Sequence, residues 1–483
     1  MSTLPLYRRL ADHYRGAIET GTLAPGDRFP SVRALVERHG VSLSTALQLC
    51  RQLESDGWLE ARPRSGNFVR RPKPLAARPL AEPSADQPLD PAQYIGIHSQ
   101  VSEIIARGQH SPVRVNFSGA RCAPEHYPGE ALKNAAVRAL RRQPQVLVEV
   151  PSYRGDAAFR TVLARRAMAA GMVLGADDIL VTQGCIEALN LALRAVTRPG
   201  DIVAVESPTF YGLLQVLETL GLRALEIPTS PQTGISLEAC ELALRGNEVI
   251  KALVVVPHLQ NPLGSIMPDA HQQRLVELCA VHGVPLIEDD TYSALVDDEM
   301  PRRALKSWDT TGNVMHCSTL HKILAPGLRL GWISAGRWQA RVEMLKYAQN
   351  RHNEALPQMA AADFLASSAF DRHLRRLRDT LRGQRERTAA TLAACFPAGT
   401  ALNQPHGGLS LWVELPGRLS SRALFEAALA EGILIAPGLM FSNSSRCDHF
   451  IRIGCGLPYT PVVDSALRRL GELTAGLLAA QAA

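Results

Sequence analysis

The chain has 483 residues, which is too long for one ordinary hydrophobic core and predicts two or three domains. Its composition, with 46% hydrophobic and 20% charged residues, is typical of a soluble globular protein, and no apolar run reaches the roughly 18–20 residues of a membrane span. Nine scattered cysteines without a C-x-x-C pair disfavour a disulfide framework or a metal site, and the start lacks the apolar core of a secretory signal. We therefore expect a cytoplasmic protein with reduced thiols and no membrane partner.

The positive charge is concentrated near the N-terminus. The net charge of the chain is +6, and residues 1–73 contain 12 Lys/Arg and 7 Asp/Glu, so this segment alone carries +5. Such an asymmetry favours an anionic partner for the segment, with nucleic acid as the first candidate.

The N-terminal segment predicts three helices followed by a hairpin. Apolar residues recur at helical spacing over 7–17, and Ser31 and Ser42 can cap a second and a third helix. Two short β-rich runs follow at 58–61 and 67–70. This order of elements is typical of a winged helix-turn-helix domain.

The same segment resembles the DNA-binding domain of GntR-type regulators, through Gly26–Arg33, Val41–Thr45, Leu53–Leu59 and Arg62–Val69. The resemblance implies that the segment binds double-stranded DNA, although many members have an arginine where Leu43 stands. The residues that it brings to the duplex or to the wing are Arg33, Ser42, Ser44, Thr45, Arg64, Ser65 and Gly66. The alternative is a small protein–protein module whose arginines are solvated.

Residues 1–71 are thus expected to form the DNA-binding domain. A proline-rich segment at 72–110 has little apolar periodicity and predicts a semi-stiff tether, with a short helix at 98–107. The remainder, 111–483, is expected to form the larger domain.

From about residue 178 the larger domain alternates short β-rich runs with helical stretches. The expected strands are Ile179–Thr182, Ile202–Glu206, Ala252–Val256, Pro285–Glu288, Val314–Cys317 and Leu330–Ala335, and the expected helices are 185–197, 211–221, 237–245 and 268–282. Such alternation predicts a mostly parallel sheet covered by helices, whose ligands bind at the carboxyl ends of the strands.

Polar residues follow several of these strands. Gly184 opens a helix whose backbone N–H groups can hold a phosphate, Asn261 and Asp289 follow later strands, and Lys322 comes next. A lysine amine can form a Schiff base with an aldehyde such as pyridoxal phosphate (PLP), and Arg329 offers a fork for phosphate. Each feature alone is usually a turn, a solvated strand end or a solvated pair. Their common position at strand ends favours a cofactor site.

This order of motifs resembles the fold-type I PLP enzymes, in particular the class I/II aminotransferases, over about residues 111–480. The resemblance implies that Lys322 is the catalytic Schiff-base lysine, that Asp289 holds the ring nitrogen and that Arg452 binds a substrate or effector carboxylate. The other cofactor-binding residues that it implies are Asn261 and Tyr292 at the ring hydroxyl, Phe210 on the ring face, and Gly184, Cys185, Thr319 and Arg329 at the phosphate. The sequence departs from the family at Cys185, His321 and Val150, which stand where a small polar residue, a serine and a tyrosine are common, and Tyr153 is out of register with that tyrosine.

A GntR-type winged helix joined to an α/β aminotransferase-like domain, with a large subdomain at about 155–345, is the architecture of the MocR subfamily of bacterial regulators. The resemblance implies a homodimeric transcriptional regulator, nucleoid-associated when bound to DNA, that senses PLP or an amine or amino-acid effector through a Lys322 aldimine. Two alternatives stay open: a working PLP-dependent aminotransferase with an accessory DNA-binding module, and a dimerisation scaffold that no longer binds PLP. Repressor and activator are equally compatible with the sequence.

Overall fold

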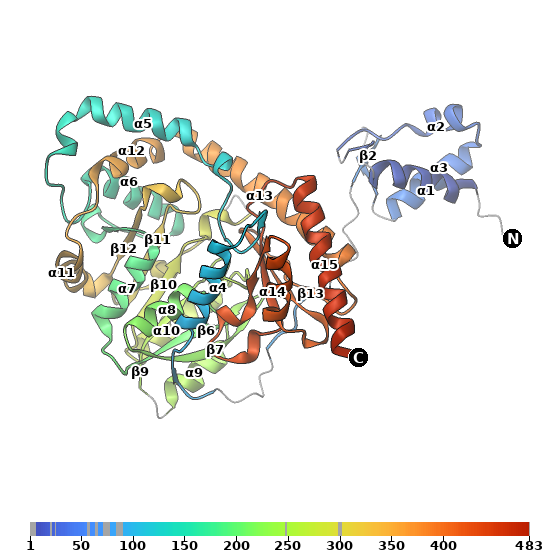
Figure 1. The fold of residues 1–483 in the computed structure, drawn as a ribbon. Coiled ribbons are helices and arrows are strands. Elements are labelled where there is room, and N and C mark those ends of the chain that lie inside the picture. Colours follow the sequence, from blue (N-terminus) through green and yellow to red (C-terminus); the bar gives the residue numbers. More distant parts are fainter. Residues whose placement is uncertain are drawn as a thin grey trace. The chain divides into compact units, whose positions relative to one another are not determined.

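The computed structural model describes residues 6–19, 22–24, 26–55, 58–62, 66–70, 78–83, 90–246, 249–297 and 302–482. The chain divides into two compact units, residues 1–77 and residues 78–483, each with its own core (Figure 1).

The first unit is a three-helix domain with a hairpin. Its elements are α1 (Leu6–Glu19), α2 (Val32–His39), α3 (Leu43–Ser55), β1 (Leu59–Arg62) and β2 (Gly66–Val69). The two strands pair antiparallel and form the wing. This confirms the predicted winged helix-turn-helix fold.

Local chemistry sets the boundaries of α2. The Ser31 side chain accepts a hydrogen bond from the backbone N–H of Ala34 at 3.2 Å and so caps the helix start. Gly40 ends the helix in the left-handed conformation at φ 61°, and its N–H donates to the carbonyl of Val36. Leu35 on the inner face is fully buried against the other helices.

The second unit is built on a large sheet in which nine strands are described. Their order is β3-β7-β6-β9-β10-β11-β12-β5, with β8 paired to β7. The bounds are β3 (Gln93–Tyr94), β5 (Leu180–Thr182), β6 (Ile202–Ser207), β7 (Arg223–Ser230), β8 (Gly234–Ile235), β9 (Ile250–Val255), β10 (Leu286–Asp290), β11 (Val314–Thr319) and β12 (Gly331–Ser334). Strands β7, β6, β9, β10 and β11 run parallel, whereas β12 is antiparallel to both of its neighbours, so β5 again runs in the common direction. The predicted mostly parallel sheet is confirmed.

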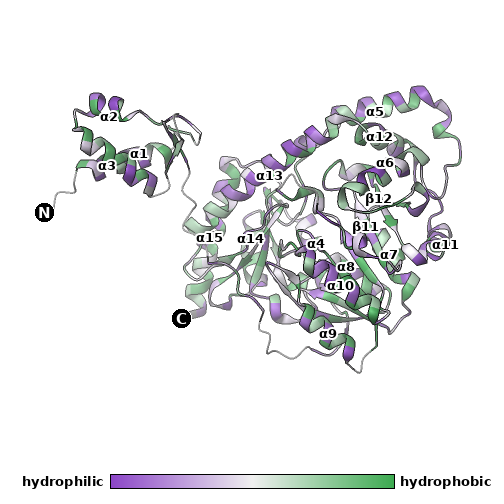
Figure 2. Cartoon of the chain, turned by 180° about the vertical axis from the view of Figure 1, so that it is seen from behind, coloured by the Kyte–Doolittle hydropathy of each residue, from purple (hydrophilic) through white to green (hydrophobic). Residues whose placement is uncertain are grey.

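The helices of this unit are α4 (His98–His110), α5 (Gly129–Arg142), α6 (Ala157–Ala167), α7 (Cys185–Val196), α8 (Tyr211–Thr219), α9 (Leu237–Arg245), α10 (Asp269–Val281), α11 (Gln339–Gln349), α12 (Ala355–Leu365), α13 (Ser368–Cys395), α14 (Ser421–Ala430) and α15 (Pro461–Ala482). They cover the large sheet, as crossover connections between parallel strands require, except that α14 and α15 pack in the C-terminal part of the unit (Figure 1). Hydrophilic and hydrophobic residues alternate along α13 (Figure 2), as in a helix with one buried face.

A smaller antiparallel sheet completes the unit, with the order β13-β14-β17-β16. Its strands are β13 (Ala401–Leu402), β14 (Ser410–Glu414), β16 (Ala436–Pro437) and β17 (Phe450–Gly454). A separate parallel pair joins β4 (Val115–Asn116) to β15 (Ile433–Leu434). The segment between β3 and β5 is therefore tied to the C-terminal part of the unit.

Two features differ from the expectations. The second unit begins at Arg78, and Tyr94 pairs with Arg223 in the large sheet, so residues 90–110 of the expected tether belong to the folded unit. Strand β7 had no predicted counterpart. It contains Pro228, a residue that usually argues against a strand interior, and its local pattern gives no sign that it lies between β3 and β6.

Candidate functional site

The loops after the parallel strands bring polar side chains to one edge of the large sheet. Asn261 follows β9, Asp289 lies near the end of β10, and Lys322 follows β11. Because β12 runs in the opposite direction, Arg329, which precedes it, returns to the same edge. Strands β10, β11 and β12 lie side by side (Figure 1). Residues predicted from separate motifs thus come from neighbouring strands.

Lys322 has its amine inside the site, close to Arg452 and Asp289. Its Nζ donates a hydrogen bond to the carbonyl of Ala120 at 2.6 Å and lies 5.7 Å from the centre of the Tyr292 ring. Burial lowers the pKa of Lys322 to about 8, and the positive charge of Arg452 acts in the same direction. A large share of the amine is therefore neutral, and hence nucleophilic, slightly above neutral pH.

Asp289 has only neutral donors as its hydrogen-bonding partners among the described residues. Its Oδ1 accepts hydrogen bonds from the Thr291 hydroxyl at 2.5 Å and from the Cys185 thiol at 3.2 Å. Burial raises the pKa of Asp289, and burial also raises the pKa of Cys185, which keeps that thiol protonated as a donor. A buried carboxylate with this surrounding favours a ligand that brings a positive charge.

Arg452 reaches the site from β17 of the smaller sheet and is only 1% exposed. Its Nη1 donates to Oδ1 of Asn261 at 2.9 Å, its Nη2 donates to the carbonyl of Ser118 at 2.5 Å, and its guanidinium lies 4.9 Å from the centre of the Phe441 ring. The buried Nε has no hydrogen-bond partner among the described residues. An arginine with an unused buried donor is suited to an anionic ligand.

Asn261 connects this arginine to Tyr292. Its Nδ2 lies 3.5 Å from the Tyr292 hydroxyl while its Oδ1 accepts from Arg452. Burial raises the pKa of Tyr292, so the phenol stays protonated. The structure therefore brings both predicted partners of the ring hydroxyl next to the predicted carboxylate clamp.

Gly184, Thr319 and Arg329 converge at the start of α7. A Cβ on Gly184 would lie 3.5 Å from Nη2 of Arg329 and 3.9 Å from Oγ1 of Thr319, and the glycine has φ 101°. A Cβ on Gly331 would come within 2.6 Å of Gly184, so β12 passes directly against this turn. A helix N-terminus, a hydroxyl and a guanidinium together form an arrangement that can hold a phosphate.

Phe210 lies at the N-cap of α8 and is half-buried. Its ring is folded over Gly212, where a Cβ would come within 2.5 Å of it, and lies 4.8 Å from the ring of Tyr211. Tyr211 in turn lies 5.7 Å from Phe441, the ring beneath Arg452. Phe210, the residue predicted to stack on the cofactor ring, thus belongs to a group of aromatic rings with Tyr211 and Phe441 beside Arg452.

Sequence reasoning missed the segment 118–122, which crosses the site. The carbonyls of Ser118 and Ala120 accept hydrogen bonds from Arg452 and Lys322, and the Cys122 thiol lies 3.9 Å from the carbonyl of Lys322. Backbone acceptors have no side-chain signature. The one sequence feature that relates to this contact is Gly454. A Cβ added at that position would lie 2.3 Å from the carbonyl oxygen of Gly119, so the close approach of the two segments requires a glycine.

The described residues of the predicted DNA-binding set lie on α2, at the start of α3 and at the start of β2. Arg33 is exposed in the first turn of α2, and Ser42, Ser44 and Thr45 surround the start of α3. Gly66 begins β2 with φ 96°. Arg64 and Ser65 lie outside the described residues.

Comparison with known proteins identifies both units. The bacterial GntR family of regulatory proteins matches residues 6–69, and the class I and II aminotransferases match residues 124–470. The chain is 36% identical over 466 residues to the uncharacterized HTH-type transcriptional regulator YjiR of Escherichia coli K12, which covers 96% of this chain and 98% of that protein. The chain belongs to the MocR-type transcriptional regulators. The HTH-type transcriptional regulator TauR of Rhodobacter capsulatus is 29% identical over 453 residues, 91% of this chain and 90% of its own length.

Solved structures resemble the second unit of this MocR-type regulator. The α-aminoadipate aminotransferase LysN of Thermus thermophilus, complexed with N-(5'-phosphopyridoxyl)-L-leucine, has a TM-score of 0.71 at 27% identity and covers 78% of this chain and 95% of its own. The kynurenine aminotransferase of Pyrococcus horikoshii, in complex with PMP, has a TM-score of 0.72 at 26% identity and the same coverage. The predicted fold-type I aminotransferase fold is confirmed.

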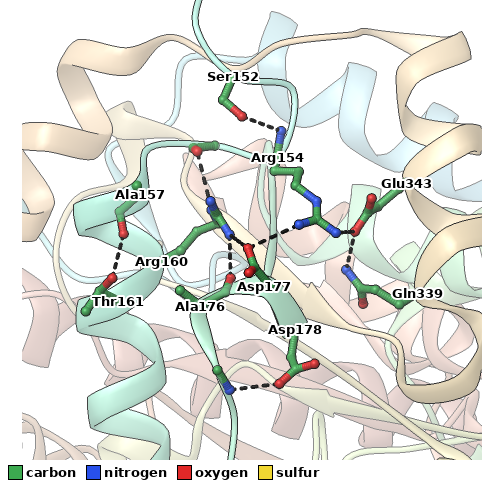
Figure 3. Close-up of polar contacts among 12 residues, drawn as sticks. Ser152, Arg154, Ala157, Arg160, Thr161, Ala176, Asp177, Asp178, Gln339 and Glu343 are labelled. Atoms are coloured by element: carbon green, nitrogen blue, oxygen red, sulfur yellow. Dashed lines mark hydrogen bonds and ion pairs between the residues drawn. The ribbon is translucent and has the colours of Figure 1, made fainter.

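A charged network fixes the loop before α6 in this MocR-type regulator (Figure 3). Arg154 forms ion pairs with Glu343 at 2.7 Å and with Asp177 at 3.1 Å, and Asp177 also pairs with Arg160 at 3.0 Å. The next residue, Gly155, has φ 102° and packs so closely that a Cβ would lie 2.3 Å from a methyl group of Val181. This loop is therefore held by both charge and close packing.

Tyr153 in the same loop turns toward α11. Its hydroxyl donates to Glu343 at 3.4 Å, and its ring lies 5.7 Å from the ring of Tyr347. Val150, where the resemblance to the aminotransferases led us to expect a tyrosine, is 79% exposed. This regulator thus presents an apolar side chain to solvent at that position.

In the described part of the chain, no helix is long and apolar enough to cross a membrane. The same residues contain no group of three or more His, Cys, Asp or Glu side chains arranged to hold a metal ion.

Proposed function

We propose that this MocR-type regulator binds PLP at Lys322 and transmits the arrival of an amine or amino-acid effector to its DNA-binding unit. The observation that carries the proposal is the convergence of Lys322, Asp289 and Arg452 from three different strands and two sheets at one edge. These side chains offer a nucleophilic amine, a buried carboxylate and a buried guanidinium.

The described residues match the chemical groups of PLP. Gly184, Thr319 and Arg329 suit its phosphate, and the carboxylate of Asp289, held only by neutral donors, suits a protonated ring nitrogen. When bound, PLP supplies an aldehyde that reacts with primary amines and a ring that withdraws electrons. The phosphopyridoxyl-leucine in LysN and the PMP in the kynurenine aminotransferase support this assignment.

Lys322 and Arg452 are proposed to bind different groups: Lys322 the aldehyde of PLP, and Arg452 the carboxylate of the effector. Because burial lowers the pKa of Lys322 to about 8, its amine can be neutral under physiological conditions and can take the aldehyde. Arg452 has a planar fork and an unused buried Nε, so it suits the carboxylate of an effector that arrives with its own amine. We infer that the effector carries both an amine and a carboxylate.

The segment 118–122 supports a route by which binding changes the unit. The amine of Lys322 holds the carbonyl of Ala120, and Arg452 holds the carbonyl of Ser118. A ligand that engages either side chain competes with one of these hydrogen bonds and so loosens the segment. Regulation also requires that the effector bind the DNA-binding conformation and the non-binding conformation of the protein with different affinity.

We further propose that the regulator acts as a homodimer. Leu147, Val148 and Val150 expose apolar side chains on one short stretch, where a second copy would remove them from water. A second candidate function is a working aminotransferase. The observation that favours it is that Lys322, Asp289 and Arg452 are all in place, as catalysis would require.

The proposal is tested by the visible absorbance of the purified protein mixed with PLP. Wild type is expected to develop a visible band, Lys322→Ala to lack it, and Lys133→Ala, which removes an exposed lysine of α5, to keep it. A panel of amino acids is then added, each with and without a second keto acid that can accept the amino group. A spectral change with one amino acid and no turnover in the presence of the acceptor supports a sensor, steady conversion of the amino acid to its keto acid supports the enzyme, and a wild type without a band contradicts both.

A further inference from the structure

The helix α3 exposes two leucines on one face. Leu43 is 61% exposed and Leu47 is 39% exposed, and four residues separate them, so they lie about 6 Å apart along the helix. The opposite face is formed by Ala46, Leu49 and Leu53, which are buried in the core of the unit. The exposed pair is therefore not needed to complete the core.

The hydroxyl groups beside Leu43 bond mainly to one another. Oγ of Ser42 lies 2.9 Å from Oγ of Ser44 and 2.8 Å from Oγ1 of Thr45, and it also accepts a hydrogen bond from the backbone N–H of Thr45 at 3.2 Å. Ser42 thus caps α3. The side chains that project from the first two turns without such bonds are the leucines, followed by the exposed Gln48.

We propose that Leu43 and Leu47 read the C5-methyl groups of thymines in the major groove. The three residues 40–42 connect α2 to α3, as in a helix-turn-helix, and the N-terminal part of the second helix of that motif contacts base edges. The thymine methyl is the apolar group that a base edge presents in that groove, and it suits an aliphatic side chain. Arg33 and Arg51 are also exposed, and both are of the residue type that contacts phosphates.

This inference goes beyond DNA binding itself, because it assigns sequence readout to two apolar residues. Where an arginine would select guanine, these leucines select thymine at the matching operator positions. Burial of one methyl-sized group corresponds to about a fourfold change in affinity.

The experiment begins by selecting preferred sequences from random duplexes with the full-length protein. Each thymine of the selected site is then replaced by uracil, which removes only the C5-methyl group. At one or more positions uracil is expected to weaken wild-type binding about fourfold, while Leu43→Ala or Leu47→Ala binds the thymine and uracil duplexes equally. Both leucines are exposed, so thermal unfolding of the variants is expected to match wild type.

Leu6→Ala is the matched control, since Leu6 is also an exposed leucine, on α1 of the same unit. It is expected to discriminate thymine from uracil as wild type does. The inference is overturned if no thymine is sensitive to uracil, if both alanine variants keep the wild-type discrimination, or if the selection enriches no sequence. A loss of DNA binding in the leucine variants without any uracil effect would indicate a protein contact instead.

Discussion

The reactivity of Lys322 toward an aldehyde is predicted to depend on pH with a break near pH 8. Burial lowers the pKa of its amine to about 8, and the charge of Arg452 adds to the shift. With the ordinary lysine pKa, about one amine in three thousand is neutral at pH 7, whereas with a pKa of about 8 the fraction is about one in ten, a gain of about 300-fold. The environment of the site thus increases the neutral fraction of this amine at pH 7, and the neutral amine is the form that reacts with an aldehyde.

The assay is the rate at which the visible band grows after mixing with PLP, measured from about pH 6 to about pH 10, with Lys322→Ala as the background. The logarithm of the rate is predicted to rise with pH up to the pKa of Lys322 and then to level off. Arg452→Gln removes the neighbouring positive charge and should move the break to higher pH. A rate that keeps rising in proportion through pH 10 would refute the reasoning, because it would show an unperturbed amine.

Three further predictions concern other parts of the molecule. Asp289→Asn should weaken PLP binding more than tenfold, as measured by titration with PLP. The same variant should not lower the melting temperature of the cofactor-free protein, because burial raises the pKa of Asp289 and its ionised form therefore destabilises the folded state. Gly155→Ala should lower the free energy of unfolding by about 2–4 kcal/mol, because its Cβ would meet Val181, whereas Gly129→Ala, with open space around it, should change it by less than about 1 kcal/mol in the same denaturant titration. Arg33→Ala should weaken DNA binding and reduce the slope of log affinity against log salt by about one, with the PLP spectrum unchanged; an unchanged slope would mean that Arg33 makes no phosphate contact.

The parts of the fold that local patterns encode were predictable. Ser31 caps α2 as expected, and the alternation of apolar runs and helices after residue 178 corresponds to β5, β6, β9, β10 and β11 with their crossover helices. Motifs at the ends of those strands also gave residues that meet in space, because parallel strands place their carboxyl ends at one edge.

The rest of the site depends on contacts between distant parts of the chain. The carbonyl of Ser118 accepts a hydrogen bond from Arg452, and that of Ala120 accepts one from Lys322. The two partners are hundreds of residues apart in the sequence in each case, and a backbone carbonyl leaves no pattern in the sequence that would predict such a contact. Strand β7 escaped prediction because Pro228 argues against a strand, while its place in the sheet comes from pairing with β3 and β6. Residues 90–110 looked like a tether because their pairing partner, Arg223, lies far away along the chain.

The proposed control of DNA binding by chemistry at Lys322 can be measured in one experiment. The affinity of the PLP-loaded protein for its selected operator is measured with and without the amino acid that changes the visible spectrum, in wild type and in Lys322→Ala. We expect the amino acid to change the affinity of wild type and to leave that of the variant unaltered. An equal change in both proteins, or no change in a wild type whose spectrum responds, would contradict it.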